Sequence, residues 1–191
     1  GSWLSLSSSL FRTTRKNVYT ILLVPDPNGP GSIDVSQVFS YRVKGWETDL
    51  SLRPTATWNI NANFTLQDPV LVDYPQNPGQ IGNRVPSVPK QIGNAWTSYD
   101  IALPDKIGSL QLAAGLRYRG DYFGDTGQTR LLPGATMVDL SAALLNGPLT
   151  IRGGVSNIGD KRNYDYAAGV GSGAIPGPGR TFFLSIGLKT L

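Results

Sequence analysis

Residues 57–67 read Thr-Trp-Asn-Ile-Asn-Ala-Asn-Phe-Thr-Leu-Gln, and their polarity changes at every position. The even-numbered side chains are all apolar, and the odd-numbered side chains are all polar. Because successive side chains of a β-strand point to opposite faces, this segment predicts a strand with one apolar and one polar face. A helix, with a period of about 3.6 residues, would mix the two sets on every face.

The same alternation recurs along the rest of the chain. It predicts eight strands, at 3–14, 34–53, 56–67, 89–103, 109–121, 134–145, 149–158 and 179–191. The connections alternate in length, with short ones at 54–55, 104–108 and 146–148 and long ones at 15–33, 68–88, 122–133 and 159–178. Outer-membrane barrels have short periplasmic turns and long extracellular loops. We therefore predict an all-β fold, an antiparallel up-and-down transmembrane β-barrel of about eight strands whose two chain ends lie on the periplasmic side.

Composition narrows the classes of function. Only 16% of the 191 residues are charged, and no run of 18 apolar residues could form a transmembrane helix. The chain has no cysteine and no histidine, which excludes a disulfide framework, a thiolate metal site and a hydrolase that relies on a histidine base. The net charge of +4 comes from scattered residues, so we do not expect nucleic-acid binding. We expect no enzymatic activity and no cofactor.

Short motifs follow one another in a specific order. They are Gly45-Trp46-Glu47, Val85-Pro86 with Val88-Pro89, the stretch 115–120, Asn157 to Lys161 followed by Tyr164, and the stretch 176–180. Their order and spacing resemble the C-terminal barrel of TonB-dependent siderophore receptors. The resemblance extends over nearly the whole chain.

The resemblance implies a fold, a place and a partner. It implies that residues 1–191 form a single outer-membrane β-barrel domain, the C-terminal part of a larger receptor barrel, with no plug domain among them. It further implies the bacterial outer membrane as the location, with membrane lipid as a partner of the barrel wall. Ferric siderophore and the TonB system would be partners only of a full-length parent, so the fragment alone is expected not to transport.

Eight charged side chains are predicted to lie on the polar, inward face. They are Glu47, Asp49, Asp100, Asp139, Arg117, Arg119, Arg152 and Lys189. In a wide receptor they would line a polar wall along which a ligand passes. We hypothesise instead that the eight strands close into a small barrel by themselves, in which the charges have to pair in a tightly filled interior.

Aromatic and basic residues of the long loops are candidates for ligand contact, as the resemblance implies for siderophore receptors. They are Tyr74, Arg84, Tyr122, Phe123, Arg130, Tyr164 and Tyr166. Rings and cations together suit a planar or anionic chelate. The alternative is that these residues form an aromatic girdle and contact lipid headgroups.

Two other functions are compatible with parts of the sequence. The first is an autonomous small outer-membrane barrel with a structural, adhesive or minor pore role. The second is a soluble β-protein that binds carbohydrate or lipid. Continuous apolar faces exposed to water would aggregate, which argues against the soluble protein.

Overall fold

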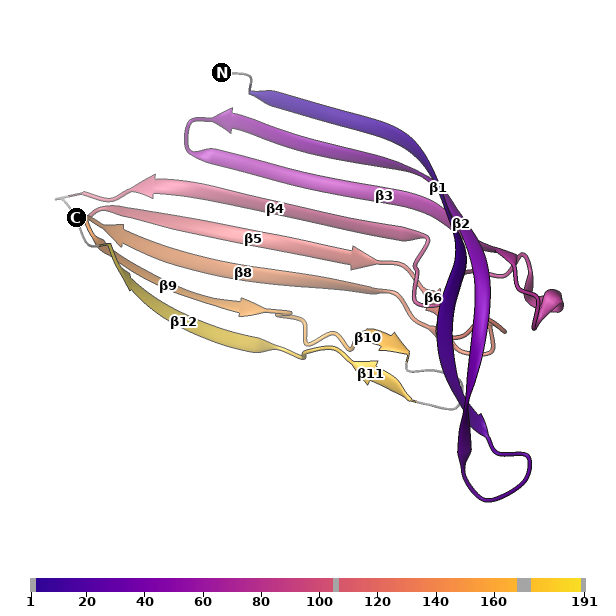
Figure 1. Ribbon diagram of the computed structural model, residues 1–191. Helices are drawn as coiled ribbons and strands as arrows, with labels where there is room; N and C mark the ends of the chain where they lie inside the picture. The colour runs from indigo at the N-terminus through magenta and orange to yellow at the C-terminus, as the bar shows by residue number, and fades with distance from the viewer. Residues whose placement is uncertain (1–2, 105–106, 168–172, 190–191) are drawn as a thin grey trace.

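The computed structural model describes residues 3–104, 107–167 and 173–189, apart from the side chains of residues 20, 22–25, 166 and 167. Eight strands form one antiparallel sheet in which each strand pairs with its neighbours along the chain (Figure 1). They are β1 (Leu4–Pro25), β2 (Ser32–Thr55), β3 (Trp58–Asp73), β4 (Gln91–Ala102), β5 (Ser109–Arg119), β8 (Ala135–Asn146), β9 (Leu149–Ser156) and β12 (Thr181–Leu188). The predicted up-and-down sheet of eight strands is thereby confirmed.

Smaller elements lie in the long connections. The strands β6 (Tyr122–Phe123) and β7 (Leu131–Leu132) form one short ladder, and β10 (Tyr164–Ala167) and β11 (Ala174–Pro176) form another. The 3₁₀ turn Pro78–Gln80 lies between β3 and β4. Within the described residues, no helix is both long and apolar enough to cross a membrane.

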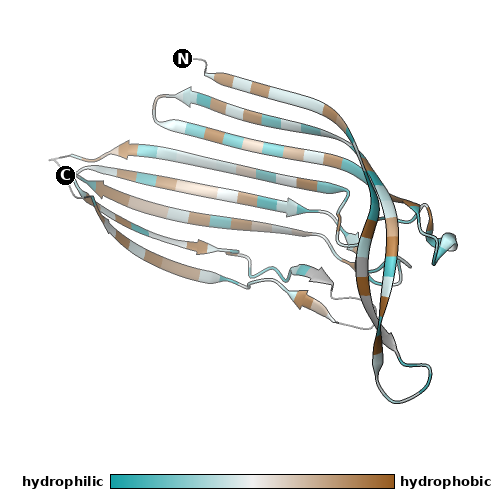
Figure 2. Cartoon of the chain, in the orientation of Figure 1, coloured by the Kyte–Doolittle hydropathy of each residue, from teal (hydrophilic) through white to brown (hydrophobic). Residues whose placement is uncertain are grey.

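The strand register aligns apolar positions across the whole sheet. One row of directly opposed residues crosses all eight strands: Leu4, Leu52, Ile60, Thr97, Ala114, Leu140, Val155 and Phe182. The Thr97 hydroxyl, the one polar group in this row, accepts a hydrogen bond from Trp58 Nε1 at 2.9 Å and donates one to the carbonyl of Asn59. Alternating bands of hydropathy along each strand are visible in Figure 2. We call the side that carries this row the apolar face and the opposite side the polar face.

Neither face is covered by a second layer of the described chain. Phe182 and Leu184 on the apolar face are 75% and 73% exposed. The buried apolar clusters lie instead at the end of the sheet that carries the long loops, where Leu71 of β3 forms one with Tyr74 and Val85, and Tyr122 and Leu132 form the other. An uncovered apolar face of this extent requires an apolar surrounding, which a bilayer supplies.

The sheet is open. Within the described residues β1 pairs only with β2 and β12 pairs only with β9, and the two strands lie at opposite edges (Figure 1). The hypothesis that the eight strands close into a small barrel by themselves is therefore wrong for this structure. Closure requires that tilt and register bring the first and last strands within pairing distance, and these eight strands do not achieve it.

The segment 15–33, predicted as a long loop, is mostly strand. After a register shift between Arg15 and Val18, β1 continues to Pro25 and pairs with β2 down to Ser32. Asn17 at this irregularity has a positive φ of 53°, a conformation that asparagine tolerates better than most residues. The charges and the asparagine at 15–17 therefore mark a bulge within a long strand.

Candidate functional site

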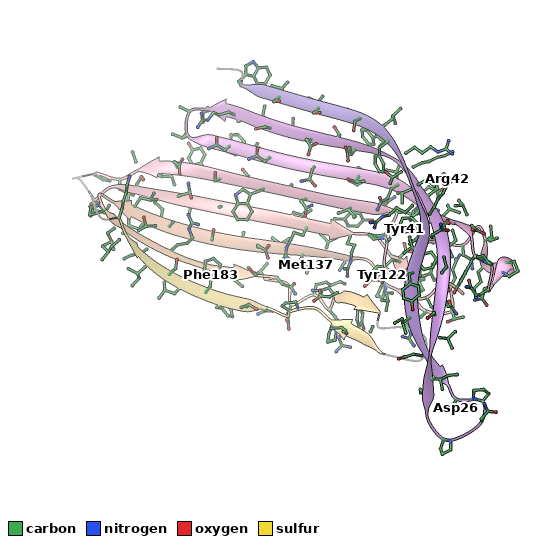
Figure 3. The ribbon with its side chains drawn as sticks, viewed as in Figure 1. Asp26, Tyr41, Arg42, Tyr122, Met137 and Phe183 are labelled. Atoms are coloured by element: carbon green, nitrogen blue, oxygen red, sulfur yellow. The ribbon has the colours of Figure 1, made fainter. Side chains whose placement is uncertain are left out.

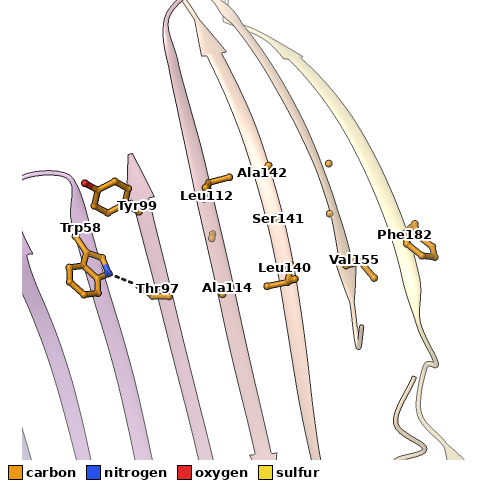
Figure 4. A pocket seen from close by; sticks show the side chains of 13 residues that line it. Trp58, Thr97, Tyr99, Leu112, Ala114, Leu140, Ser141, Ala142, Val155 and Phe182 are labelled. Atoms are coloured by element: carbon orange, nitrogen blue, oxygen red, sulfur yellow. Dashed lines mark hydrogen bonds between the residues drawn. The ribbon is translucent and has the colours of Figure 1, made fainter. Parts of the chain in front are cut away.

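The apolar face carries a shallow hollow of about 830 Å³ (Figure 4). Its lining is drawn from β3, β4, β5, β8, β9 and β12, with small side chains such as Ala114 and Ala142 between larger ones such as Trp58 and Phe182. The Trp58 ring also packs edge-on against Tyr99, with 6.5 Å between the ring centroids. Because the lining is almost entirely apolar, this hollow suits hydrocarbon and offers no group for orienting a polar ligand.

The polar face carries a different hollow, of about 520 Å³. Ser7, Asn63 and Asn94 line it together with Asp49 and Arg117. The Trp96 ring lies over Gly115, where a Cβ atom would be only 2.5 Å from the ring. This surface offers hydrogen-bond donors and acceptors of the kind that a hydrated ligand or a polar protein segment would use.

The eight charges predicted for the polar face do not form one network. Arg117 and Asp139 form an ion pair with 3.0 Å between Nε and Oδ2, and no other two of the eight are paired within the described residues. Glu47 accepts a hydrogen bond from Ser9, and Asp100 accepts one from Gln111. Arg119 lies over the Tyr122 ring and donates to the carbonyl of Tyr164, while Asp49 lines the polar hollow. The structure makes no ion pair for Arg152 or Lys189 in the described part of the chain.

Asp139 connects the wall of the sheet to the loop that follows β9. Its carboxylate accepts hydrogen bonds from Arg117 on β5 and from the backbone N–H of Asn157, at 3.1 and 2.7 Å to Oδ1. The Asn157 side chain is 2% exposed and exchanges hydrogen bonds with the backbone of Lys161 at 2.8 and 2.9 Å. Asn157 also has a φ of 52°. The motif from Asn157 to Lys161 is thus a loop closure whose geometry depends on the asparagine.

A smaller hollow of about 320 Å³ lies beside this closure. It is lined by Met137, which Figure 3 labels, and by Arg117, Asn163, Asp165 and Thr181. Asn163 is 4% exposed, and its side-chain amide donates to the carbonyl of Pro178 at 3.3 Å. Sequence reasoning did not single out Asn163 or Thr181 for this position. Asn163 lies two residues beyond the motif 157–161 and directly before the candidate Tyr164, and these two signals pointed near it.

The loop between β3 and β4 is tied to the loop between β5 and β8. Arg84 forms an ion pair with Asp121, with 2.9 Å between Arg84 Nη1 and Asp121 Oδ2, and its guanidinium lies 5.2 Å from the centroid of the Phe123 ring. The backbone N–H of Ser87 donates to the carbonyl of Phe123 at 2.8 Å, and Asn83 donates to the carbonyl of Thr126. These contacts hold the two loops together at one end of the sheet.

The same loop is tied to the one after β9. Tyr122 is 1% exposed, and its hydroxyl donates to the carbonyl of Tyr164 at 2.9 Å. Burial raises the pKa of the Tyr122 hydroxyl although the nearby Arg119 cation lowers it, so the group stays protonated as this hydrogen bond requires. The three long loops that follow β3, β5 and β9 therefore form one connected layer.

The structure thus places the seven loop candidates in different roles. Tyr74 is 1% exposed in the cluster with Leu71 and hydrogen-bonds Gln37, so it packs the loop layer, as Tyr122 does. Arg84 and Phe123 contact each other, and Tyr164 packs against the second buried cluster. Arg130 lies in the loop between β5 and β8, where its backbone N–H donates to Asp125. The side chain of Tyr166 lies outside the described residues. The structure does not bring the other six side chains together in one pocket of the described residues.

Replacing Arg84 by Ala is expected to loosen the layer without unfolding the sheet. The change removes the ion pair with Asp121 and the contact with Phe123, which together are worth about 1–2 kcal/mol at a partly buried site. Amide hydrogen exchange should rise in 74–90 and 120–134 but stay unchanged in β8 and β9. Arg84→Lys keeps the charge and loses the planar group, so amide exchange in the two loops should lie between that of the wild-type protein and that of Arg84→Ala. Unchanged exchange in both loops would contradict the assigned role.

Comparisons with known proteins give a consistent result. Residues 1–158 match the family model described as TonB dependent receptor-like, beta-barrel. The chain is 29% identical to a probable TonB-dependent siderophore receptor, PiuA, of Acinetobacter baumannii over 97% of its own length and 24% of the receptor. It is 28% identical to the ferrioxamine B receptor of Salmonella typhimurium over 82% of its length and 22% of that receptor. The chain thus spans about a quarter of the length of these curated relatives.

Solved structures show the same likeness. The crystal structure of the siderophore receptor PiuA from Acinetobacter baumannii matches 97% of this chain with a TM-score of 0.75 at 28% identity, over 26% of that receptor. The ferric preacinetobactin receptor BauA, also from Acinetobacter baumannii, matches 97% of the chain over 27% of its own, with a TM-score of 0.77 at 22% identity, a likeness of fold.

Proposed function

The chain belongs to the TonB-dependent receptor-like β-barrel family, and from this premise we propose that it forms part of the wall and outer loop layer of an outer-membrane receptor that takes up ferric siderophores. The observation that carries the proposal is the two-faced sheet. Its apolar face is uncovered, its polar face carries a hollow lined by polar and charged side chains, and its long loops are tied together at one end. A wall between lipid and an aqueous lumen needs these three features.

The open sheet favours a larger assembly over an autonomous small barrel. Both edges, β1 and β12, present backbone groups that the described residues leave without a neighbouring strand. In hydrocarbon such groups must be paired, because no water is available to bond them. Since the chain spans about a quarter of its relatives, we infer that further strands complete the barrel and that the 191 residues alone do not transport.

We assign ligand contact to the end of the sheet at which the long loops are tied together, which we call the loop end. The hollow beside Asn163 combines a cation, Arg117, with the carboxylate of Asp165 and neutral hydrogen-bond donors, at the border between polar face and loops. Such a mixture suits a polar chelate better than an apolar solute. Arg84 and Phe123 would shape the neighbouring loops and contribute less directly.

Replacing Thr181 by Trp is expected to raise the siderophore concentration needed for half-maximal iron uptake by about tenfold, a loss of about 1.4 kcal/mol of binding. The larger ring would fill the hollow that Thr181 lines. Uptake of radioactive iron from a panel of ferric siderophores would be measured in cells that express the longest natural reading frame containing this chain. The receptor genes of the host would be deleted.

The matched control is Phe182→Trp, which alters the adjacent position on the apolar face. It should leave iron uptake unchanged because the side chain of Phe182 does not line the hollow beside Asn163. If the cells took up no iron from any ferric siderophore tested, the proposed function would be wrong. It would also be wrong if iron uptake persisted after the membrane was de-energised.

A further inference from the structure

Three basic side chains lie together on the apolar face, on the loop side of its last apolar row. In that row Leu10 is opposite Trp46, and Trp46 is opposite Leu66. Two positions further along the strands, Arg12 is opposite Lys44 and Lys44 is opposite Asp68, and two positions beyond that, Arg42 is opposite Val70. No register shift interrupts this stretch of β2, so alternate residues keep to one face. We call Arg12, Arg42 and Lys44 the basic row.

The basic row lies at the level where lipid headgroups begin. From Trp58 to Leu66 the apolar face of β3 spans eight residue steps, or about 27 Å at about 3.4 Å per residue along a strand. Tilt of the strand by about 35–45° reduces this height to about 19–22 Å, slightly less than the apolar band of about 25 Å that outer-membrane barrels present to lipid, so the band ends close to the next row on this face. Arg12 and Lys44 come directly after this band, and Arg42 lies where β1 and β2 bend away from the other strands (Figure 3).

The charges of the basic row are not balanced by the described part of the chain. Arg12 and Lys44 are exposed and directly opposite each other, an arrangement of like charges that destabilises a strand pair. The neighbouring acid, Asp68, forms its ion pair with Lys90, at 3.5 Å between Oδ1 and Nζ. Within the described residues none of the three basic side chains has an ion-pair partner, and Arg42 Nε is buried without a hydrogen bond.

We propose that the basic row binds the phosphate of an anionic lipid headgroup in the membrane leaflet nearest the loops. Two guanidinium groups and one ammonium supply charge-assisted donors for phosphate oxygens. Leu10 and Trp46, directly below, provide the apolar surface along which the acyl chains of the same lipid can lie. The row is on the face opposite the polar hollow, so a solute in the lumen does not reach it. This site rests on the membrane placement under the proposed function.

The test is lipid binding by the purified protein, in the longest natural reading frame, counted by native mass spectrometry after removal of endogenous lipid. Phosphatidylglycerol, phosphatidylcholine and inorganic phosphate serve as separate probes. The protein should bind phosphatidylglycerol in preference to phosphatidylcholine. The double variant Arg12→Gln/Lys44→Gln should bind phosphatidylglycerol about 30-fold more weakly. Each of the two cations is expected to contribute about half of this loss of binding free energy.

Two further variants keep the result interpretable. Arg53→Gln/Arg152→Gln removes the same charge from the polar face, where Arg53 donates to Asn59 and Arg152 is opposite Ser185, and should leave phosphatidylglycerol binding unchanged. Asp68→Asn removes the one acid beside the row and should strengthen binding, a gain that misfolding cannot produce. A heat-shifted band on a gel would show that each variant is folded.

Equal binding of the two lipids, an equal loss in both double variants, or displacement of phosphatidylglycerol by equimolar inorganic phosphate would overturn the inference. The proposed function fails in a different way. If the protein does not fractionate with the outer membrane, the receptor assignment is wrong. If it does so and shows no preference for phosphatidylglycerol, only the lipid site is wrong.

Discussion

Replacing Leu140 by Arg is expected to lower the free energy of unfolding in a bilayer by about 2–4 kcal/mol. Leu140 lies in the middle of β8, in the row of opposed residues that crosses the apolar face, and is 40% exposed. A guanidinium at that depth would lose its hydration without gaining a partner. Reversible denaturation in phospholipid vesicles, followed by tryptophan fluorescence, would measure the change.

The neighbouring residue supplies the control. Ser141 is one step along β8 and therefore on the polar face, opposite Ala113 and Gly154. Ser141→Arg introduces the same group on the water-facing side, where we expect a change within about 0.5 kcal/mol. If the two substitutions destabilised the protein equally, the assignment of one face to lipid and the other to water would be wrong.

Replacing Asn157 by Ala is expected to cost about 3 kcal/mol of stability at the loop end. The side chain is 2% exposed and forms two hydrogen bonds with the backbone of Lys161, and the loss of such a buried group costs about 1–3 kcal/mol. A further cost of about 1 kcal/mol comes from placing alanine at a φ of 52°. Hydrogen exchange and limited proteolysis of 157–167 and 173–180 would report the opening of this loop.

Asn157→Gly separates the two contributions. Glycine accepts the positive φ without strain and removes only the side-chain hydrogen bonds, so it should cost less than alanine. Because Asn157 also donates its backbone N–H to Asp139, opening of the loop should loosen the contact between Asp139 and β9. If alanine and glycine had equal effects, backbone strain would play no part, and if neither had an effect, the closure would not depend on this asparagine.

Much of the fold could be predicted from the sequence because alternation is a local property. Whether Asn59 and Ile60 lie on opposite faces depends only on the extended backbone between them. The residues on each face of a strand can therefore be assigned from the sequence of that strand alone. The same holds for the turns, since the Asn146-Gly147-Pro148 connection contains a glycine with a φ of 55°. Those signals were sufficient for eight strands and their order, and the structure confirms both. The family was recognised separately, from the resemblance of the ordered motifs, and the family model confirms it.

The site could be predicted only in part because loop contacts join residues far apart in the chain. Tyr74 and Tyr122 were candidates for ligand contact because they are aromatic residues of long loops in a chain that resembles siderophore receptors, and both are buried in the packing of the loop layer. Nothing near Arg84 in the sequence indicates that its partner is Asp121. The bulge at Asn17 likewise resembled the end of a strand, because the register that carries β1 onward depends on β2.

By itself, then, the sequence determined that this chain forms an amphipathic antiparallel sheet, since polarity at every second residue needs no distant partner. The resemblance of its ordered motifs added the TonB-dependent receptor type. Only the tertiary structure decided that the sheet stays open, that Asp139 pairs with Arg117, and that Arg12 and Lys44 are opposite each other above the apolar band. Those facts depend on the register between strands and on the tilt of the sheet. Both are set by the sum of many cross-strand contacts, and no single segment of the chain encodes that sum.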